Sequence, residues 1–307
     1  VPKIHLIKRL QFKTHAMISL FSGVIGLVIA IIFAILGYGV YSLIWQLIIT
    51  SIVYTISLIA VSHYRFAFCF SYMSFKELLG FGFNTTSANF IKNFVENVFV
   101  NVIAKVAPLR LTGYYNQSFR LQNVVSSVQT TIIDNALFPV LSREADKRIV
   151  DVSVRINYMA AFGAVLLYIL FIFNAHMIVL LMLGEDWIGM IPYFKLLLVG
   201  GIFQSFTAFN RNIFKTLAET FSIVKCELFS LIALLALLIT MKYGINAIIY
   251  TFIGYALWRW QVSVVLLARN GHIDYGSYMK KLLQILLPIL FSFFIIYSIT
   301  IFDSIII

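Results

Sequence analysis

Long uninterrupted runs of apolar residues dominate this sequence and most constrain its fold. Several reach the length of about 20 residues that a helix needs to cross the hydrocarbon of a bilayer. Only 11% of the residues are charged, whereas a soluble domain carries about 25%. Membrane barrels use short alternating strands, and these runs are too long and too uniformly apolar for that. The sequence therefore predicts an all-α, polytopic integral membrane protein, built as a helical bundle.

Turn residues divide the apolar sequence into about nine expected transmembrane helices. Their ranges are 16–37, 38–62, 78–106, 117–141, 154–173, 190–210, 221–241, 245–267 and 282–302. We expect two spans in 1–62 and a six-helix lobe in 78–267. The remaining segment, 268–307, is expected to hold a cytoplasmic loop and an extra C-terminal span. The aromatic stretch 63–77 fits an amphipathic cytoplasmic linker, and a plain surface loop fits it equally well.

The distribution of positive charge sets the expected orientation. With the N-terminus inside, fifteen of the 23 lysines and arginines fall in inner segments, Arg211 and Lys215 among them. Three fall in outer segments, namely Lys105, Arg110 and Lys242. Membrane proteins concentrate positive charge on the cytoplasmic side. The net charge of +11 therefore indicates a cytoplasmic N-terminus and no nucleic-acid partner.

No motif of an enzyme, a metal site or a cofactor site stands out. Cys69 and Cys226 lie in or beside apolar segments, with the spacing of neither a disulfide framework nor a metal site. GxSxG, HExxH and phosphate-binding glycine loops are absent from the sequence. Glu185 and Asp186 fit a helix-end turn better than a catalytic pair. We expect no catalytic residue, no metal and no cofactor.

The expected span 78–106 carries a polar stripe through its middle. At about 100° per residue, one face of roughly 100° holds Thr85, Asn89, Lys92, Asn93 and Glu96. A lysine that faces lipid at mid-span costs at least ~2.5–3.5 kcal/mol. The stripe is therefore predicted to face a hydrated cavity or other helices.

The next span repeats this pattern. One face of about 140° holds Gln117, Arg120, Asn123, Ser127, Thr130, Thr131 and Asp134. If the two stripes face each other, they line a hydrated passage. Arg120 and Asp134 are about 21 Å apart along a helix, so each needs another partner or water. Arg259, between two tryptophans, is a further deep cation that suits either the cavity or a packed interface.

Purely structural explanations compete with the passage. Lys92 and Glu96 are spaced i, i+4 and can neutralise each other. Asparagine, serine and threonine also join membrane helices, at about 0.6–2 kcal/mol for each hydrogen bond. Both explanations stay open at the level of sequence.

The order of several stretches resembles the Wzx-type oligosaccharide flippases of the polysaccharide transporter family, within the multidrug/oligosaccharidyl-lipid/polysaccharide exporter superfamily. These stretches are LGYGVYSLIWQ (36–46), SFKELLGFGFNTTSANFIKNFVENV (74–98), LTGYYNQSFRLQNVVSS (111–127), LFPVLSREADKR (137–148), and 181–220 from LMLGEDW to TLAET. The chain departs from the pattern at Gln117, where the family has a basic residue after GYYN, and near Gln122, where the family has a proline. Arg120 therefore cannot be matched to the basic residue by strict alignment.

The resemblance implies a transporter of the bacterial inner (cytoplasmic) membrane that flips polyprenyl-diphosphate-linked oligosaccharide outward by alternating access, for cell-surface polysaccharide synthesis. It implies coupling to a proton or sodium ion and contact with membrane lipids and polysaccharide assembly proteins. It also implies an N-terminally truncated member, with 1–62 as the last two spans of a first lobe. Candidate cavity residues are Asn89, Lys92, Asn93, Arg120, Asn123, Ser127, Thr130 and Arg259. Glu96 and Asp134 are candidates for the coupling ion.

Three alternatives compete with the flippase. A cation-coupled multidrug exporter of the same superfamily comes next, although embedded cations outnumber embedded acids here, which favours an anionic substrate. A polymerase or ligase would be expected to have a large outer loop, and the expected outer loops are short. An accessory membrane subunit is the third alternative.

Overall fold

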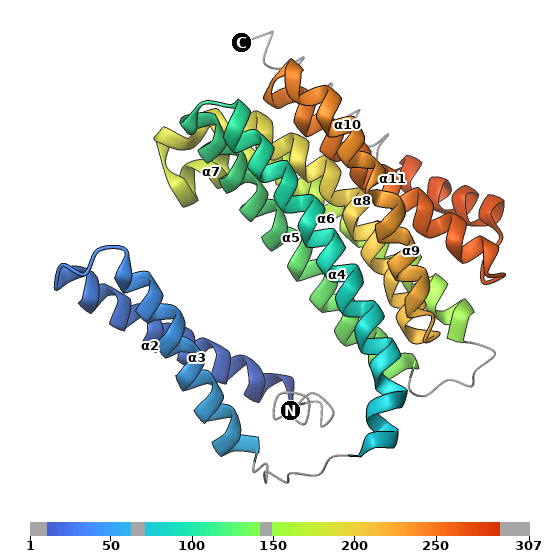
Figure 1. Ribbon diagram of the computed structural model, residues 1–307, viewed down its shortest axis with the longest axis horizontal. Helices are drawn as coiled ribbons and strands as arrows, with labels where there is room; N and C mark the ends of the chain where they lie inside the picture. Colours follow the sequence, from blue (N-terminus) through green and yellow to red (C-terminus); the bar gives the residue numbers. More distant parts are fainter. Residues whose placement is uncertain (1–10, 63–70, 142–148, 289–307) are drawn as a thin grey trace. The chain divides into compact units, whose positions relative to one another are not determined.

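The computed structural model describes residues 11–62, 71–141 and 149–288, and nearly all of them are helical (Figure 1). No strand occurs in these ranges. The elements are α2 (Phe12–Ile35), α3 (Tyr41–Ser62), α4 (Tyr72–Val106), α5 (Leu109–Leu141), α6 (Ile149–Phe173), α7 (Ala175–Leu183), η2 (Glu185–Met190), α8 (Ile191–Thr216), α9 (Thr220–Ser230), α10 (Ile232–Thr240), η3 (Met241–Tyr243), α11 (Ile245–Arg269) and a helix over 275–288. The predicted all-α class is confirmed.

The chain divides into unit 1, Val1–Ser71, and unit 2, Tyr72–Ile307. In unit 1, α2 packs against α3, and a Cβ at Gly26 would overlap the Thr50 hydroxyl. His15 and Tyr54 join the two helices through a 2.9 Å hydrogen bond. Large apolar side chains such as Leu20 remain exposed along both helices. Such a surface suits contact with lipid rather than water.

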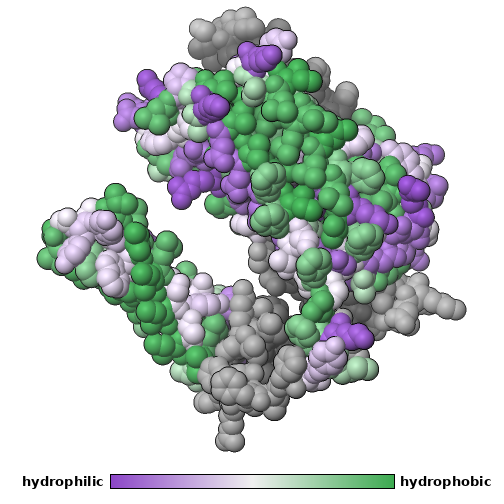
Figure 2. All heavy atoms as spheres, viewed as in Figure 1, coloured by the Kyte–Doolittle hydropathy of each residue, from purple (hydrophilic) through white to green (hydrophobic). Residues whose placement is uncertain are grey.

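Six helical segments of the described residues are long and apolar enough to cross a membrane. They are Lys13–Ile35, Tyr41–Val61, Val150–Phe173, Glu185–Thr216, Thr220–Tyr243 and Ile245–Arg269. Two further helices, α4 and α5, have 35 and 33 residues, or about 50 Å at 1.5 Å per residue, but carry the polar stripes. In unit 2, Figure 2 shows broad hydrophobic surface with hydrophilic side chains gathered toward the two ends. The chain is therefore a multi-pass membrane protein.

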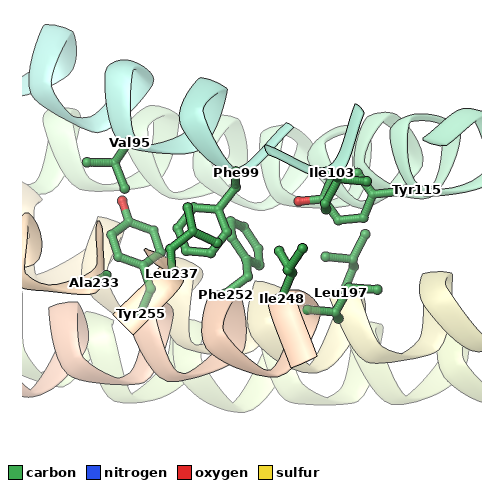
Figure 3. Close-up of a cluster of buried hydrophobic side chains, with 11 residues drawn as sticks. Val95, Phe99, Ile103, Tyr115, Leu197, Ala233, Leu237, Ile248, Phe252 and Tyr255 are labelled. Atoms are coloured by element: carbon green, nitrogen blue, oxygen red, sulfur yellow. The ribbon is translucent and has the colours of Figure 1, made fainter. Parts of the chain in front are cut away.

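Apolar packing joins the helices of unit 2. Figure 3 shows Val95 and Phe99 of α4 directed toward Tyr255 and Phe252 of α11, and Ile103 of α4 beside Tyr115 of α5. Phe99 lies edge-to-face with Phe252, at a ring-centroid distance of 5.4 Å. These side chains are fully or almost fully buried. This cluster holds the C-terminal half of α4 against α11.

Several helix boundaries refine the expected spans. The span expected at 221–241 is broken at Leu231 into α9 and α10, and the Trp258 indole donates a 3.0 Å hydrogen bond to the Phe229 carbonyl beside the break. Gly184 and Gly244 are the N-cap residues of η2 and α11. Both have a φ of 87°, a conformation that favours glycine. The expected ninth span, 282–302, is described only to residue 288. Of the expected linker, 63–77, residues 63–70 lie outside the described residues.

Candidate functional site: a charged cluster inside the helical bundle

The polar stripe of α4 begins the site. Lys92 and Glu96 lie one helical turn apart, and 3.6 Å separates Lys92 Nζ from Glu96 Oε1. The i, i+4 pair considered from the sequence therefore forms. The Lys92 side chain is 33% exposed and that of Glu96 is 12% exposed. Lys92 thus reaches the surface of unit 2, while Glu96 is turned toward its interior.

Three other helices supply a buried ion triad. Glu227 of α9 forms ion pairs with Arg259 of α11 and Arg211 of α8. Its Oε1 lies 2.6 Å from Arg259 Nη2 and 3.3 Å from Arg211 Nη1. The Glu227 side chain is 0% exposed. Taking charge out of water is costly, so a buried carboxylate and its guanidinium partners depend strongly on one another.

Helix α4 is connected to this triad. Arg211 donates a 2.8 Å hydrogen bond to Asn89 Oδ1, and Asn89 lies about one helical turn before Lys92 on α4. We call Lys92, Glu96, Arg211, Glu227 and Arg259 the ion cluster. When all are ionised, three cations face two carboxylates, so the cluster carries one excess positive charge. Exposure falls from the surface at Lys92 to zero at Glu227.

Two polar atoms in the ion cluster have no hydrogen-bond partner in the described part of the chain. They are Glu227 Oε2 and Arg259 Nε, and both are buried. Cys226 Sγ donates at 3.4 Å to the Arg259 carbonyl, and the Tyr255 ring centroid lies 6.0 Å from Arg259 Cζ. The centre of the cluster is therefore tightly enclosed but keeps hydrogen-bonding capacity.

The predicted residues of α5 lie elsewhere. Arg120, Asn123 and Ser127 are exposed on unit 2, as is Asn93 of α4. Thr130 and Asp134 belong to α5, but their side chains lie outside the described residues. The structure thus brings Asn89, Lys92, Glu96 and Arg259 together, and it leaves Arg120, Asn123 and Ser127 of the α5 stripe exposed on unit 2.

A second polar face of α5 is buried, and the sequence reading missed it. Gln122 Nε2 donates at 2.8 Å to Ser126 Oγ, which lies 2.8 Å from the Tyr168 hydroxyl of α6. Ser205 of α8 donates at 2.7 Å to Gln129 Oε1. These bonds join α5, α6 and α8 as interhelical contacts. The seven-residue spacing of the two glutamines was the signal that could have revealed this face.

Arg211 and Glu227 were also missed as site residues. Arg211 was counted with the cytoplasmic segments that orient the chain, but it belongs to α8 and is only 9% exposed. Helix α8 continues to Thr216, beyond the expected end of its span at residue 210, so Arg211 and Lys215 both lie in its last turns. Arg211 therefore packs among helices, whereas the prediction placed it in a loop. Glu227, the only acid in the span 221–241, was the available signal.

Long apolar helices packed around a buried charged cluster define a polytopic helical membrane protein. The family described as "Polysaccharide biosynthesis protein" matches residues 1–192, and the chain belongs to this polysaccharide transporter family. The chain is also similar to the "Succinoglycan biosynthesis transport protein ExoT" of Rhizobium meliloti (strain 1021), with 32% identity over 136 residues. That match covers 44% of this chain and 27% of the relative's length. No solved structure matches the chain.

Proposed function

We propose that this chain acts in a transporter that moves lipid-linked oligosaccharide from the inner to the outer leaflet of the bacterial cytoplasmic membrane. Family membership supports a role in polysaccharide synthesis, and the similar ExoT is named as a transport protein. The substrate class is an oligosaccharide on a polyprenyl diphosphate. The transporter moves this substrate across by alternating access and supplies it to cell-surface polysaccharide synthesis. Polysaccharide assembly proteins are its expected partners.

The excess positive charge of the ion cluster carries this proposal. A diphosphate cannot cross ~30 Å of hydrocarbon unaided, because removing water from its charges costs many kcal/mol. Lys92 is the partly exposed cation of the cluster and is positioned to meet an anion from the surface. Arg259 is buried behind it and adds positive potential. Arg120 supplies a second exposed cation on α5.

Amide and hydroxyl groups suit the sugar portion of such a substrate. Asn93, Asn123 and Ser127 are exposed on α4 and α5 and offer donors and acceptors to sugar hydroxyls. We add Asn89, which holds Arg211, and Thr130 to this set of candidate sugar-binding residues. The excess of cations over acids favours an anionic substrate over the organic cations of drug exporters.

Glu96 is our first candidate for the coupling ion, and Asp134 the second. The Glu96 carboxylate competes with the substrate because it already neutralises Lys92 at 3.6 Å. A proton or a sodium ion at Glu96 would release Lys92 to bind the diphosphate. Competition of this kind links ion binding to substrate binding reciprocally.

Removal of the charges of Lys92 and Arg120 tests the function. In cells that depend on this gene, Lys92→Ala with Arg120→Ala should abolish surface polysaccharide while the protein stays in the membrane. Lipid-linked oligosaccharide should accumulate on the inner leaflet. Lys92→Arg with Arg120→Lys preserves the charges and should retain at least part of the export.

A matched control removes two cations from the expected outer end. Lys105→Ala with Lys242→Ala changes the net charge equally and should leave export near its normal level. Undiminished export in the Lys92 and Arg120 variant would refute the cavity assignment. Single repeat units accumulating outside the cell would instead indicate a polymerase, and a change in drug susceptibility alone would indicate a drug exporter.

A further inference from the structure

A groove with a basic rim lies between α9 and α11. It encloses about 640 Å³, within the range of small-ligand sites. Its lining consists of Lys225, Leu228, Phe229, Leu266, Arg269 and Asn270. These residues are distinct from the ion cluster and from the exposed face of α5.

The two cations at the rim lack acidic partners. In the described part of the chain, no carboxylate lies within 4.0 Å of the charged groups of Lys225 or Arg269. Lys225 Nζ lies 5.0 Å from the centroid of the Phe221 ring, and both cations are exposed. Their charge is therefore available to an anion.

The acid close to this rim is already engaged. Glu219 accepts a 2.5 Å hydrogen bond from the Asn270 amide at one oxygen, and its other oxygen lies 2.8 Å from His272 Nε2. Asn270 also donates at 3.1 Å to Ser222. Glu219 thus fixes Asn270 at the rim without reaching either cation.

The deeper wall of the groove is apolar. Leu228 and Phe229 follow Lys225 by about one helical turn toward the middle of the span, and they are 49% and 56% exposed. Leu266 of α11 closes the groove and is 8% exposed. The basic rim could meet a charged lipid headgroup, and the apolar wall below it could meet an acyl chain.

The predicted orientation assigns the rim to the cytoplasmic side. Arg269 ends α11, which starts just after the expected outer residue Lys242. Basic pockets between transmembrane helices on this side bind anionic lipid headgroups. We propose that the groove binds an anionic phospholipid of the inner leaflet, with its phosphate between Lys225 and Arg269 and an acyl chain along Leu228 and Phe229.

Lipid titration followed by native mass spectrometry tests this site. The purified full protein is titrated with phosphatidylglycerol or with zwitterionic phosphatidylcholine of the same acyl chains. Lys225→Gln with Arg269→Gln should weaken phosphatidylglycerol binding about 30-fold, the effect of two basic contacts. The control Lys105→Gln with Lys242→Gln should change it less than about twofold, since these cations lie at the other end of the bundle.

A third variant separates the groove from general surface charge. Leu228→Trp fills the apolar wall and keeps the net charge, so it should also weaken phosphatidylglycerol binding. Equal loss in the outer control pair, or full binding in Leu228→Trp, would overturn the proposal. Equal binding of phosphatidylglycerol and phosphatidylcholine to the parent protein would also overturn the proposal. Capture of a polyprenyl diphosphate in place of phosphatidylglycerol would assign the groove to a transport substrate and contradict the phospholipid.

Discussion

Glu227 carries an unusual share of the interactions in unit 2. A single carboxylate oxygen contacts both Arg211 and Arg259, so this residue compensates two buried cations from different helices. Breaking a buried ion pair from one side costs more than the pair contributes, because the partner stays charged and unsolvated. The stability of the α8, α9 and α11 assembly should therefore depend on this side chain.

Glu227→Gln is expected to lower the free energy of unfolding by about 3–5 kcal/mol. The cause is the loss of the negative charge between two guanidinium groups. Denaturant unfolding of the purified protein in a fixed detergent measures this change. Glu185→Gln, at an exposed position, is the control and should have little effect. Combining Glu227→Gln with Arg259→Met should recover part of the loss, and an unaltered Glu227→Gln protein would contradict the triad.

Two neighbouring glycines of α8 offer a matched pair. A Cβ at Gly201 would lie 2.7 Å from Tyr168 Cε1 and 2.8 Å from Gln122 Nε2, whereas one at Gly200 would meet only ordinary contacts at 3.6 Å and beyond. Gly201→Ala should destabilise by about 1–3 kcal/mol through overpacking. Gly200→Ala should be neutral or stabilising by up to about 1 kcal/mol. Thermal unfolding compares the two, and equal effects would show that Tyr168 yields easily.

At the scale of elements, the helix over 275–288 depends on a capping residue. Asp274 Oδ2 accepts a 2.8 Å hydrogen bond from the Ser277 backbone N–H. Hydrogen bonds from Ser277 hold the pKa of the Asp274 carboxyl below its ordinary value. A lowered pKa means that the ionised carboxylate stabilises the fold above the ordinary pKa. This contribution is lost as the pH falls through the lowered value.

Asp274→Ala should accordingly speed amide hydrogen exchange at the start of the helix over 275–288. Asp274→Asn keeps a side-chain oxygen that can accept the bond and should exchange more like the parent protein. The difference between the parent and the alanine variant should shrink when exchange is compared at acidic pH, after correction for intrinsic rates. A pH-independent difference would indicate that the charge of Asp274 does not contribute.

The positions of most helices could be predicted from the sequence, but the rotation of each helix could not. Apolar length and turn residues were sufficient to locate α2, α3, α6, α8 and α11. Helix α5 carries polar residues on two faces, and amphipathicity alone does not tell which face packs. The stripe with Arg120 was chosen, and Gln122 and Gln129 on the buried face were missed. The meeting of Arg211, Glu227 and Arg259 required tertiary structure, because they come from three helices.

At the scale of the whole molecule, the predicted orientation has a direct test. In a background with both native cysteines replaced by serine, Lys242→Cys should react with a membrane-impermeant thiol reagent added outside intact cells. Lys280→Cys should react only after the cells are opened. Both positions are exposed, so burial does not explain a difference. The reverse labelling pattern would invert the topology and would move the basic groove to the outer leaflet.

The contacts of α4 differ along its length, and this difference bears on how unit 2 can move. Near its middle, Asn84 donates at 3.2 Å to Thr220 and Asn89 accepts from Arg211 at 2.8 Å, so directional bonds pin the helix. Farther along, Phe99 and Ile103 contact their neighbours through apolar surfaces, which are not directional. We therefore expect any swing of α4 to pivot near residues 84–89, with the moving half ending at the turn before Pro108.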